Sequence, residues 1–286
     1  MEDTRKRKNG PLQETWRRLK KNKLAVISLF LIAGMFLVAI FAPLLCPYDY
    51  AGQDYEAALM FPTAAHPFGT DNFGRDILSR IIYGSRYTVF IGFGCITIAA
   101  VIGTLLGLVA AYYPKTDNLI MRSVDIIIGM PAMTFLMCVI AVLGISITNM
   151  IIALCISKIP SFARVVRAQA LTIKNQEFIE AERAIGADNK RILFKHILPN
   201  SLAPIIVQYT LGAGSIVLWS ASLSFIGMGV QAPTPEWGLM ISQGRPYLRD
   251  QWYLTIIPGC AIMLMTFTLN LLGDGLRDAL DPRLNK

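Results

Sequence analysis

The sequence predicts an all-α membrane protein with six transmembrane helices, and three observations support this prediction. Hydrophobic residues make up 54% of the 286-residue chain and charged residues only 16%, which is too little polar surface to cover a soluble globule of this size. Long stretches of the chain carry no charge. Lysine and arginine gather in the segments that would face one side of a membrane, which also accounts for the net charge of +8.

Three of the spans follow directly from the uncharged stretches at residues 24–45, 87–113 and 251–273. As a helix, each stretch is long enough to cross about 30 Å of hydrocarbon. The first is too long for the apolar region of a cleavable signal peptide, and no cleavage site of small residues follows it. We therefore expect it to be retained as a transmembrane helix.

The uncharged stretch at residues 126–157 could form one very long helix or a hairpin of two helices. One helix would place the basic segment 158–195 on the opposite side of the membrane from the basic amino terminus. Dividing the stretch near residues 144–146 places both segments in the cytoplasm, as the positive-inside rule requires. The uncharged residues 201–235 would be about 52 Å long as one helix, so the fifth span must end or bend before Pro235.

These spans divide the chain into five parts, with both termini in the cytoplasm. The parts are a basic cytoplasmic segment (1–23), a first transmembrane helix (24–45), an extracytoplasmic loop with an amphipathic helix (46–86), a five-helix core (87–275) and a cytoplasmic tail (276–286).

Two outer segments carry recognisable patterns. Apolar residues recur at helical spacing over residues 77–82, which predicts a helix lying in the outer membrane interface, and the glycines and acids of residues 69–76 predict a turn and a helix cap before it. Prolines and glycines within residues 228–252 predict a re-entrant cap over the outer mouth, with Trp237 and Trp252 at the membrane–water boundary.

A charged amphipathic segment at residues 177–200 stands between the fourth and fifth spans. Asn175 can cap a short helix over residues 176–185, and Gly186 can end it. Phe178, Ala181 and Ile185 fall on one face of that helix, which suits a groove on another protein. The alternative is an ordinary surface helix.

A second short helix is expected after the first. Asp188 can cap its start, and Leu198-Pro199 closes it before the next span, because proline is tolerated at a helix start but cannot continue a helix.

The pattern Glu180-Ala181, then Gly186, then Leu198-Pro199 resembles the cytoplasmic signature of inner-membrane permease subunits of ABC importers. Glu182 replaces the second alanine of that signature, and His196 stands where isoleucine is usual. The resemblance extends over essentially the whole chain, including residues 66–90 and 223–238, and is to the second permease of dipeptide and oligopeptide transporters. It implies the type I ABC importer permease fold, with a coupling helix between spans four and five inside a coupling loop at 167–199.

The resemblance also implies roles for particular residues. The residues expected to couple to an ATPase are Glu177, Phe178, Glu180, Ala181, Arg183, Ala184, Ile185, Gly186, Leu198 and Pro199.

Small residues and prolines within the spans suggest how the helices pack and move. Gly103 and Gly107 have the spacing that lets two helices approach closely. A run of serines on the fifth span either lines a translocation path or packs between helices: Ser215, Ser220, Ser222 and Ser224. Three prolines can kink their helices, at Pro131, Pro160 and Pro258.

The sequence offers no chemistry of its own. It contains no phosphate-binding loop, and its five cysteines lie singly, so we expect no bound nucleotide, no metal and no catalytic residue. Basic residues scattered at helix ends do not favour nucleic acid. The resemblance implies that partner ATPase subunits bind ATP and Mg²⁺ and hydrolyse the ATP.

The resemblance further implies the partners and the location. The partners are a second homologous permease forming a heterodimer, two cytosolic ABC ATPases, membrane lipid, and an extracytoplasmic solute-binding protein facing the outer region. The location is the cytoplasmic membrane of a bacterium or archaeon. The expected function is ATP-driven import of dipeptides or oligopeptides, with this chain forming half of the path. The alternatives are import of nickel, glutathione or another solute by the same group, an ion-coupled secondary carrier, or a membrane scaffold.

Overall fold

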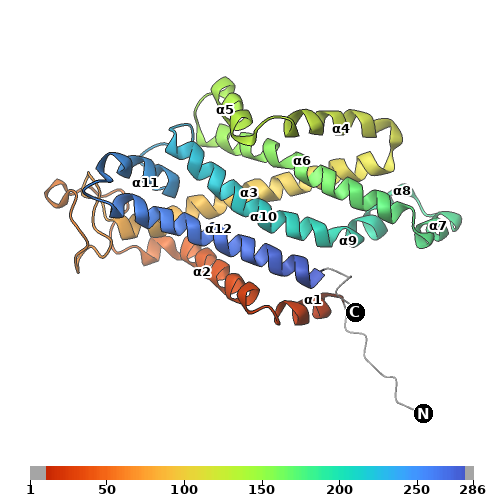
Figure 1. Ribbon diagram of the computed structural model, residues 1–286, viewed down its shortest axis with the longest axis horizontal. Coiled ribbons are helices and arrows are strands. Elements are labelled where there is room, and N and C mark those ends of the chain that lie inside the picture. The colour runs from red at the N-terminus through yellow and green to blue at the C-terminus, as the bar shows by residue number, and fades with distance from the viewer. Residues whose placement is uncertain (1–10, 281–286) are drawn as a thin grey trace, which may run out of the picture.

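The computed structural model describes residues 11–280, and within them the chain is helical without a β-strand. The long helices run roughly side by side along the longest axis of the molecule (Figure 1). Residues 1–10 of the basic amino-terminal segment and residues 281–286 of the predicted tail lie outside the described part.

Five helices of the described part are long and apolar enough to cross a membrane, and a bent pair can form a sixth span. The five are α2 (Lys23–Leu45), α3 (Ile77–Tyr112), α6 (Ile147–Lys174), α10 (Leu202–Phe225) and α12 (Tyr253–Leu280). The pair is α4 (Pro114–Ile128) and α5 (Ala132–Leu143), which bend by 96° at the break between them. Pro131 lies at this break, whereas α6 and α12 continue through Pro160 and Pro258.

The predicted division of the stretch 126–157 is confirmed. Gly144 has a φ of 91°, which glycine adopts at little cost, and Ser146 caps α6 by accepting a hydrogen bond from the Asn149 backbone N–H. However, α6 does not end at residue 157 but runs on to Lys174. Lys158, which the sequence analysis placed in the cytoplasmic loop, therefore lies about 16 Å along α6 from Ile147, in the body of the bundle.

The helix predicted in the outer interface is not a separate element. Asp76 caps α3 by accepting from the Ser79 backbone N–H, and the helix continues from Ile77 to Tyr112 without a break. This first part of α3 is covered by protein, since Ile77 and Arg80 are each 1% exposed. An interfacial location was wrong because the pattern shows only that one face is apolar, and here α11 and α12 cover that face.

Two glycines lie where α3 crosses α6 at close range. A Cβ atom on Gly103 would lie 2.5 Å from the Phe162 Cβ, and one on Gly107 would lie 2.6 Å from the Ala163 carbonyl oxygen. Both glycines therefore serve helix packing, as their spacing predicts.

One end of the bundle, called the outer end because the sequence predicts that it faces outward, carries a short cap, α11 (Trp237–Gly244) followed by η3 (Arg245–Tyr247). The cap lies beside a loop that contains η1 (Tyr55–Ala57) (Figure 1). Trp237 is only 3% exposed and donates its indole N–H to the Ile81 carbonyl, so its predicted place at the membrane–water boundary is wrong. Trp252 is 50% exposed, as a boundary residue would be. Trp237 instead fixes the cap to α3.

At the opposite end, called the inner end because the sequence predicts that it faces the cytoplasm, lie α1 (Pro11–Leu19), the end of α12 and the short helix α7 (Glu177–Ala184) (Figure 1). The chain between α6 and α10 thus emerges at the same end of the bundle as the first and last described helices.

Candidate functional site

The segment between α6 and α10 begins with a tight turn after Lys174. Asn175 ends α6 and does not cap the next helix, so that prediction was wrong. Gln176 is the cap residue of α7, and Ile185 follows its last turn. Gly186 has a φ of 82°, a left-handed conformation that suits glycine at a helix end. The helix is therefore shorter than expected, but it ends where the glycine predicts.

The two faces of α7 differ sharply. Ile179 is fully buried in a cluster with Val166 and Ile173 of α6, and this contact anchors the helix to the bundle. Phe178 is 40% exposed and Ile185 is 74% exposed. The helix thus presents an apolar stripe to the outside, the property that suits docking to a partner.

The other predicted coupling residues are also accessible around this stripe. Glu177, Glu180, Ala181, Arg183, Ala184, Gly186 and Pro199 are exposed, and Leu198 is half-buried. Glu177 and Glu180 occupy the first turn of α7 and Arg183 the last, an arrangement that complements the helix dipole.

The second half of the segment is one continuous helical path. Asp188 accepts from the Arg191 backbone N–H, as predicted, and starts α8 (Asn189–Arg191). A π-helical segment, η2 (Ile192–Ile197), then leads through α9 (Leu198–Asn200) to α10. Leu198-Pro199 therefore does not end the helix as expected. Pro199 has no N–H to donate, and the wider π turn before it accommodates the missing hydrogen bond.

The two departures from the family signature meet in space. His196 Nε2 lies 3.4 Å from Glu182 Oε1, and Arg191 Nε lies 3.5 Å from Glu182 Oε2. The side chains of His196 and Glu182 are 18% and 20% exposed. Sequence reasoning treated the two as separate substitutions, although their complementary character was a signal that they form one contact between α7 and η2.

Further contacts join this segment to the inner end of α3. Lys174 Nζ donates to the carbonyl oxygens of Ala111 and Tyr112, and the Tyr112 hydroxyl donates to Asn189 Oδ1. The Arg183 guanidinium lies 5.9 Å from the centroid of the Tyr112 ring. The segment is therefore in contact with both α6 and α3.

The structure separates the four serines of α10 into two pairs. Ser215 and Ser222 are partly exposed and donate their hydroxyls to backbone carbonyls one turn earlier. Ser220 and Ser224 are 2% and 0% exposed. Ser220 contacts the Met150 sulfur, and Ser224 accepts from the Val230 backbone N–H, so neither lines an open surface. A path-lining role remains a prediction for Ser215 and Ser222 only.

Sequence reasoning missed a buried cation that lies against Trp219 of α10. Lys158 is 7% exposed, and its Nζ lies 3.8 Å from the centroid of the Trp219 ring. The signal was present, because Lys158 is the first charge after a long apolar run. This charge was interpreted as the start of a loop. The interpretation was wrong because a helix does not have to end where its first charge appears, and α6 continues to Lys174.

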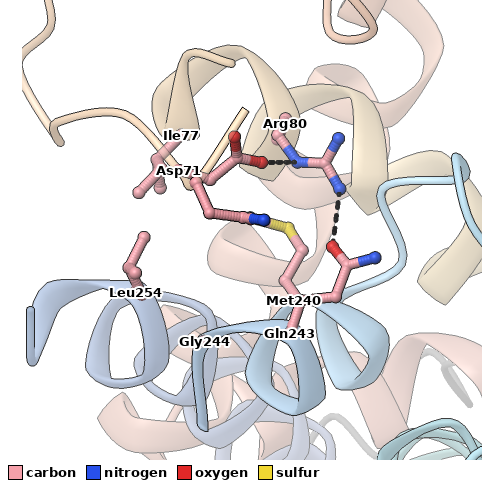
Figure 2. A pocket seen from close by; sticks show the side chains of 8 residues that line it. Asp71, Ile77, Arg80, Met240, Gln243, Gly244 and Leu254 are labelled. Carbon is pink, nitrogen blue, oxygen red and sulfur yellow. Dashed lines mark hydrogen bonds and ion pairs between the residues drawn. The ribbon is translucent and has the colours of Figure 1, made fainter. Parts of the chain in front are cut away.

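The outer end contains a buried network of charged side chains. Arg75 Nε donates to Asp71 Oδ2 at 2.7 Å, and Arg80 Nε lies 3.7 Å from the same oxygen. Figure 2 shows Arg80 between Asp71 and Gln243 of α11, whose Oε1 accepts from it at 3.4 Å. The cavity here is about 10 Å³ in volume, so the network fastens the outer loop to the cap and leaves no room for a solute.

Turns and caps account for the acidic residues around this network. Asp71 accepts from the backbone N–H groups of Phe73 and Arg75, and Asp76 caps α3, so the predicted turn and helix cap at residues 69–76 are confirmed.

Comparison with known proteins identifies the family. The model of the binding-protein-dependent transport system inner membrane component matches residues 103–286, and that of the N-terminal TM domain of oligopeptide transport permease C matches residues 10–62. This chain belongs to the binding-protein-dependent inner membrane components. Like other members, it is a multi-pass membrane permease subunit of an ABC importer.

Relatives of this inner membrane component include several peptide permeases. The dipeptide transport system permease protein DppC of Alkalihalophilus pseudofirmus is 47% identical over 276 residues, covering 96% of this chain and 91% of that relative. The di/tripeptide permease protein DppC of Pseudomonas aeruginosa is 40% identical, covering 96% of this chain and 93% of that relative. The glutathione permease protein GsiD of Escherichia coli is 43% identical, covering 96% and 91%.

A solved structure with the same architecture is the inward-facing MetNI methionine ABC transporter. It is 21% identical, has a TM-score of 0.57, and the match covers 72% of this chain and 98% of that chain. The inner membrane component therefore has the type I ABC importer permease fold, with its short helix α7 between the fourth and fifth spans.

Proposed function

We propose that this inner membrane component forms half of the translocation path of an ATP-driven importer of dipeptides or oligopeptides. Peptide permeases 40–47% identical over nearly the whole chain support the substrate class. The observation that supports the coupling mechanism is α7, a helix anchored by the buried Ile179 that presents Phe178 and Ile185 to a partner.

The energy comes from partner subunits. Two cytosolic ABC ATPases bind ATP and Mg²⁺, and one of them receives the apolar stripe of α7 in a groove. When the ATPases close, α7 moves as a rigid body and carries α6 and the inner end of α3 with it through Lys174 and Tyr112. The path then opens outward, and hydrolysis restores the inward state.

A second, homologous permease completes the path as a heterodimer. Large apolar side chains exposed on α4 and α5 support this proposal, since Leu119 is 73%, Ile126 is 68% and Val142 is 85% exposed. Ser215 and Ser222 of α10 line the path. An extracytoplasmic solute-binding protein docks at the outer end, and lipid surrounds the remaining apolar surface.

The membrane is the cytoplasmic membrane of a bacterium or archaeon, and both termini lie in the cytoplasm. Two observations support this orientation: the sequence of residues 1–23 is strongly basic, and α1 and α7 share one end of the bundle with the end of α12 (Figure 1).

Glutathione is a second candidate solute. The GsiD relatives, 43% identical over 276 residues, favour it, and glutathione is itself a small peptide with free carboxylates.

The proposal is tested by uptake of a labelled dipeptide into proteoliposomes that contain this chain, its partner permease, both ATPases and the binding protein. Ile185→Glu places a charge in the docking stripe and should reduce ATP-dependent uptake at least tenfold. Ile185→Leu is the matched control and should retain uptake. Uptake that needs no ATP, or that is unchanged in Ile185→Glu, would contradict the proposal. If peptides fail but glutathione is accumulated, glutathione is the solute.

A further inference from the structure

A single lysine lies deep in the membrane-spanning part of the molecule. Lys158 is on α6, about 16 Å along the helix from Ile147, and α6 as a whole is about 42 Å long. Only 7% of its surface is exposed. An ionised side chain at this depth is costly unless it is compensated, and such residues commonly belong to binding or transport sites.

The compensation within this chain is unusual. The Lys158 ammonium rests on the Trp219 ring, 3.8 Å from its centroid, and within residues 11–280 it has neither a carboxylate within 4 Å nor a hydrogen-bond acceptor. Two arginines of the same helix, in contrast, each have a carboxylate partner. Arg164 pairs with Asp125 at 2.7 Å, and Arg167 pairs with Asp117 at 2.5 Å. The three N–H donors of Lys158 are therefore left for another partner.

The ring that holds Lys158 belongs to the partly exposed side of α10. Trp219 and Ser222 are three residues apart, which places them on neighbouring positions of one helix face. Ser222 also lines a hollow of about 320 Å³, whose other walls are apolar and include Met133, Phe225 and Ile262. A small molecule passing along α10 would meet a hydroxyl group, an apolar wall and an ammonium ion within one or two helical turns.

We propose that Lys158 is a membrane-depth binding site for a carboxylate of the transported solute, and that Trp219 holds its ammonium group between solutes. A carboxylate attracts an ammonium ion more strongly than an aromatic ring does, so an arriving solute takes over the Nζ donors. The ring then receives the ammonium again when the solute leaves. A permanent acidic partner, such as Asp117 provides for Arg167, would prevent this exchange.

This inference rests on the proposed function, since it identifies the part of the solute that the path recognises. For a peptide, the group is the carboxyl terminus. A peptide with an amide in place of this carboxylate has no negative charge there, so Lys158 would bind it more weakly than the free acid.

The direct test measures tryptophan fluorescence of the complex with the partner permease in detergent, without ATP. Dialanine is titrated against dialanine amide. We expect a saturable emission change with dialanine only, because the ammonium leaves the Trp219 ring. Trp219→Phe, Lys158→Met and Lys158→Gln should each abolish the change, and Lys158→Arg should retain it. Lys20→Met is the matched control, since it removes a cation 5.2 Å from the ring of Trp16 at the inner end, and should leave the change intact.

The outcomes distinguish the inference from the proposed function. An equal response to the acid and the amide in the wild-type complex, or an unchanged response in both neutral variants of Lys158, would overturn the inference. In the proteoliposome assay, Lys158→Gln should lower dialanine uptake about tenfold. If wild-type proteoliposomes accumulate no peptide but the acid-specific fluorescence change is present, the carboxylate site stands and the importer proposal fails.

Discussion

The two ends of the molecule use polar and apolar residues in opposite ways. At the outer end, charged side chains are buried and satisfied by one another, as with Asp71, Arg75 and Arg80 (Figure 2). At the inner end, α7 leaves the apolar Phe178 and Ile185 uncovered. The outer end is thus held together by its own contacts, whereas the inner end has a surface that another protein can complete. The following variants test this difference, from the largest expected effect to the smallest.

Breaking the outer network should have the largest effect. Asp71→Ala leaves two arginines, 3% and 1% exposed, without their carboxylate partner. Loss of one member of such a buried cluster typically costs about 3–5 kcal/mol. We expect the free energy of unfolding in detergent to fall by this amount. Glu56→Gln, at an exposed position of the same loop, is the control and should change it by less than about 0.5 kcal/mol. Equal stability of the two variants would contradict the conclusion that buried charged contacts hold the outer end together.

Two isoleucines of the inner segment separate anchoring from docking. Ile179→Ala removes a fully buried side chain and should cost about 2–4 kcal/mol of stability. Ile185→Ala removes a side chain that is 74% exposed and should change stability by less than about 0.5 kcal/mol. In a pull-down with the ATPase, Ile185→Ala should nevertheless bind more weakly. Normal ATPase binding by Ile185→Ala would show that the stripe is not a docking surface.

The contact between Glu182 and His196 can be measured by a double-mutant cycle. Glu182→Ala and His196→Ile each remove one partner of a partly buried ion pair, and each should cost up to about 1 kcal/mol. The double variant has the residues usual in the family signature, so we expect it to be as stable as the wild type. Additive losses in thermal unfolding would mean that the two residues act independently.

The smallest effect concerns pH and the outer cap. Burial raises the pKa of Glu236, although its carboxyl group accepts the Leu239 backbone N–H and caps α11. A raised pKa in the folded state means that this group contributes stability below its ordinary pKa and loses it as pH rises through the raised value. The free energy of unfolding, measured from the ordinary glutamate pKa up to the raised value, should fall as pH rises. Glu236→Gln keeps an acceptor for Leu239 but cannot ionise, so its curve should be flatter. Parallel curves would contradict the prediction.

Local patterns predicted much of the fold and part of the candidate site. The uncharged stretches located the spans because no soluble surface can consist of such stretches. Gly144 and Gly186 marked chain reversals because their positive φ angles are costly for other residues. The spacing of Gly103 and Gly107 predicted a close crossing of helices. The exposed stripe of α7 was also visible as a periodicity.

Long-range packing decided what these patterns could not. Whether Trp237 meets lipid or Ile81, and whether Ser220 faces a path or Met150, depends on neighbours far along the chain. Asn175 had the residue type of a helix cap, but the turn after Lys174 moved the cap to Gln176.

The sequence by itself determined the membrane class, the number of spans and the location of the segment that carries the exposed stripe of α7, because these depend on hydrophobicity and on local backbone preferences. Only the tertiary structure decided which polar residues are buried and with what partners. Lys158 illustrates the reason. Its charge looked like the end of a span, but α10 brings Trp219 against it, and a contact between residues on two helices leaves no local periodicity in the chain.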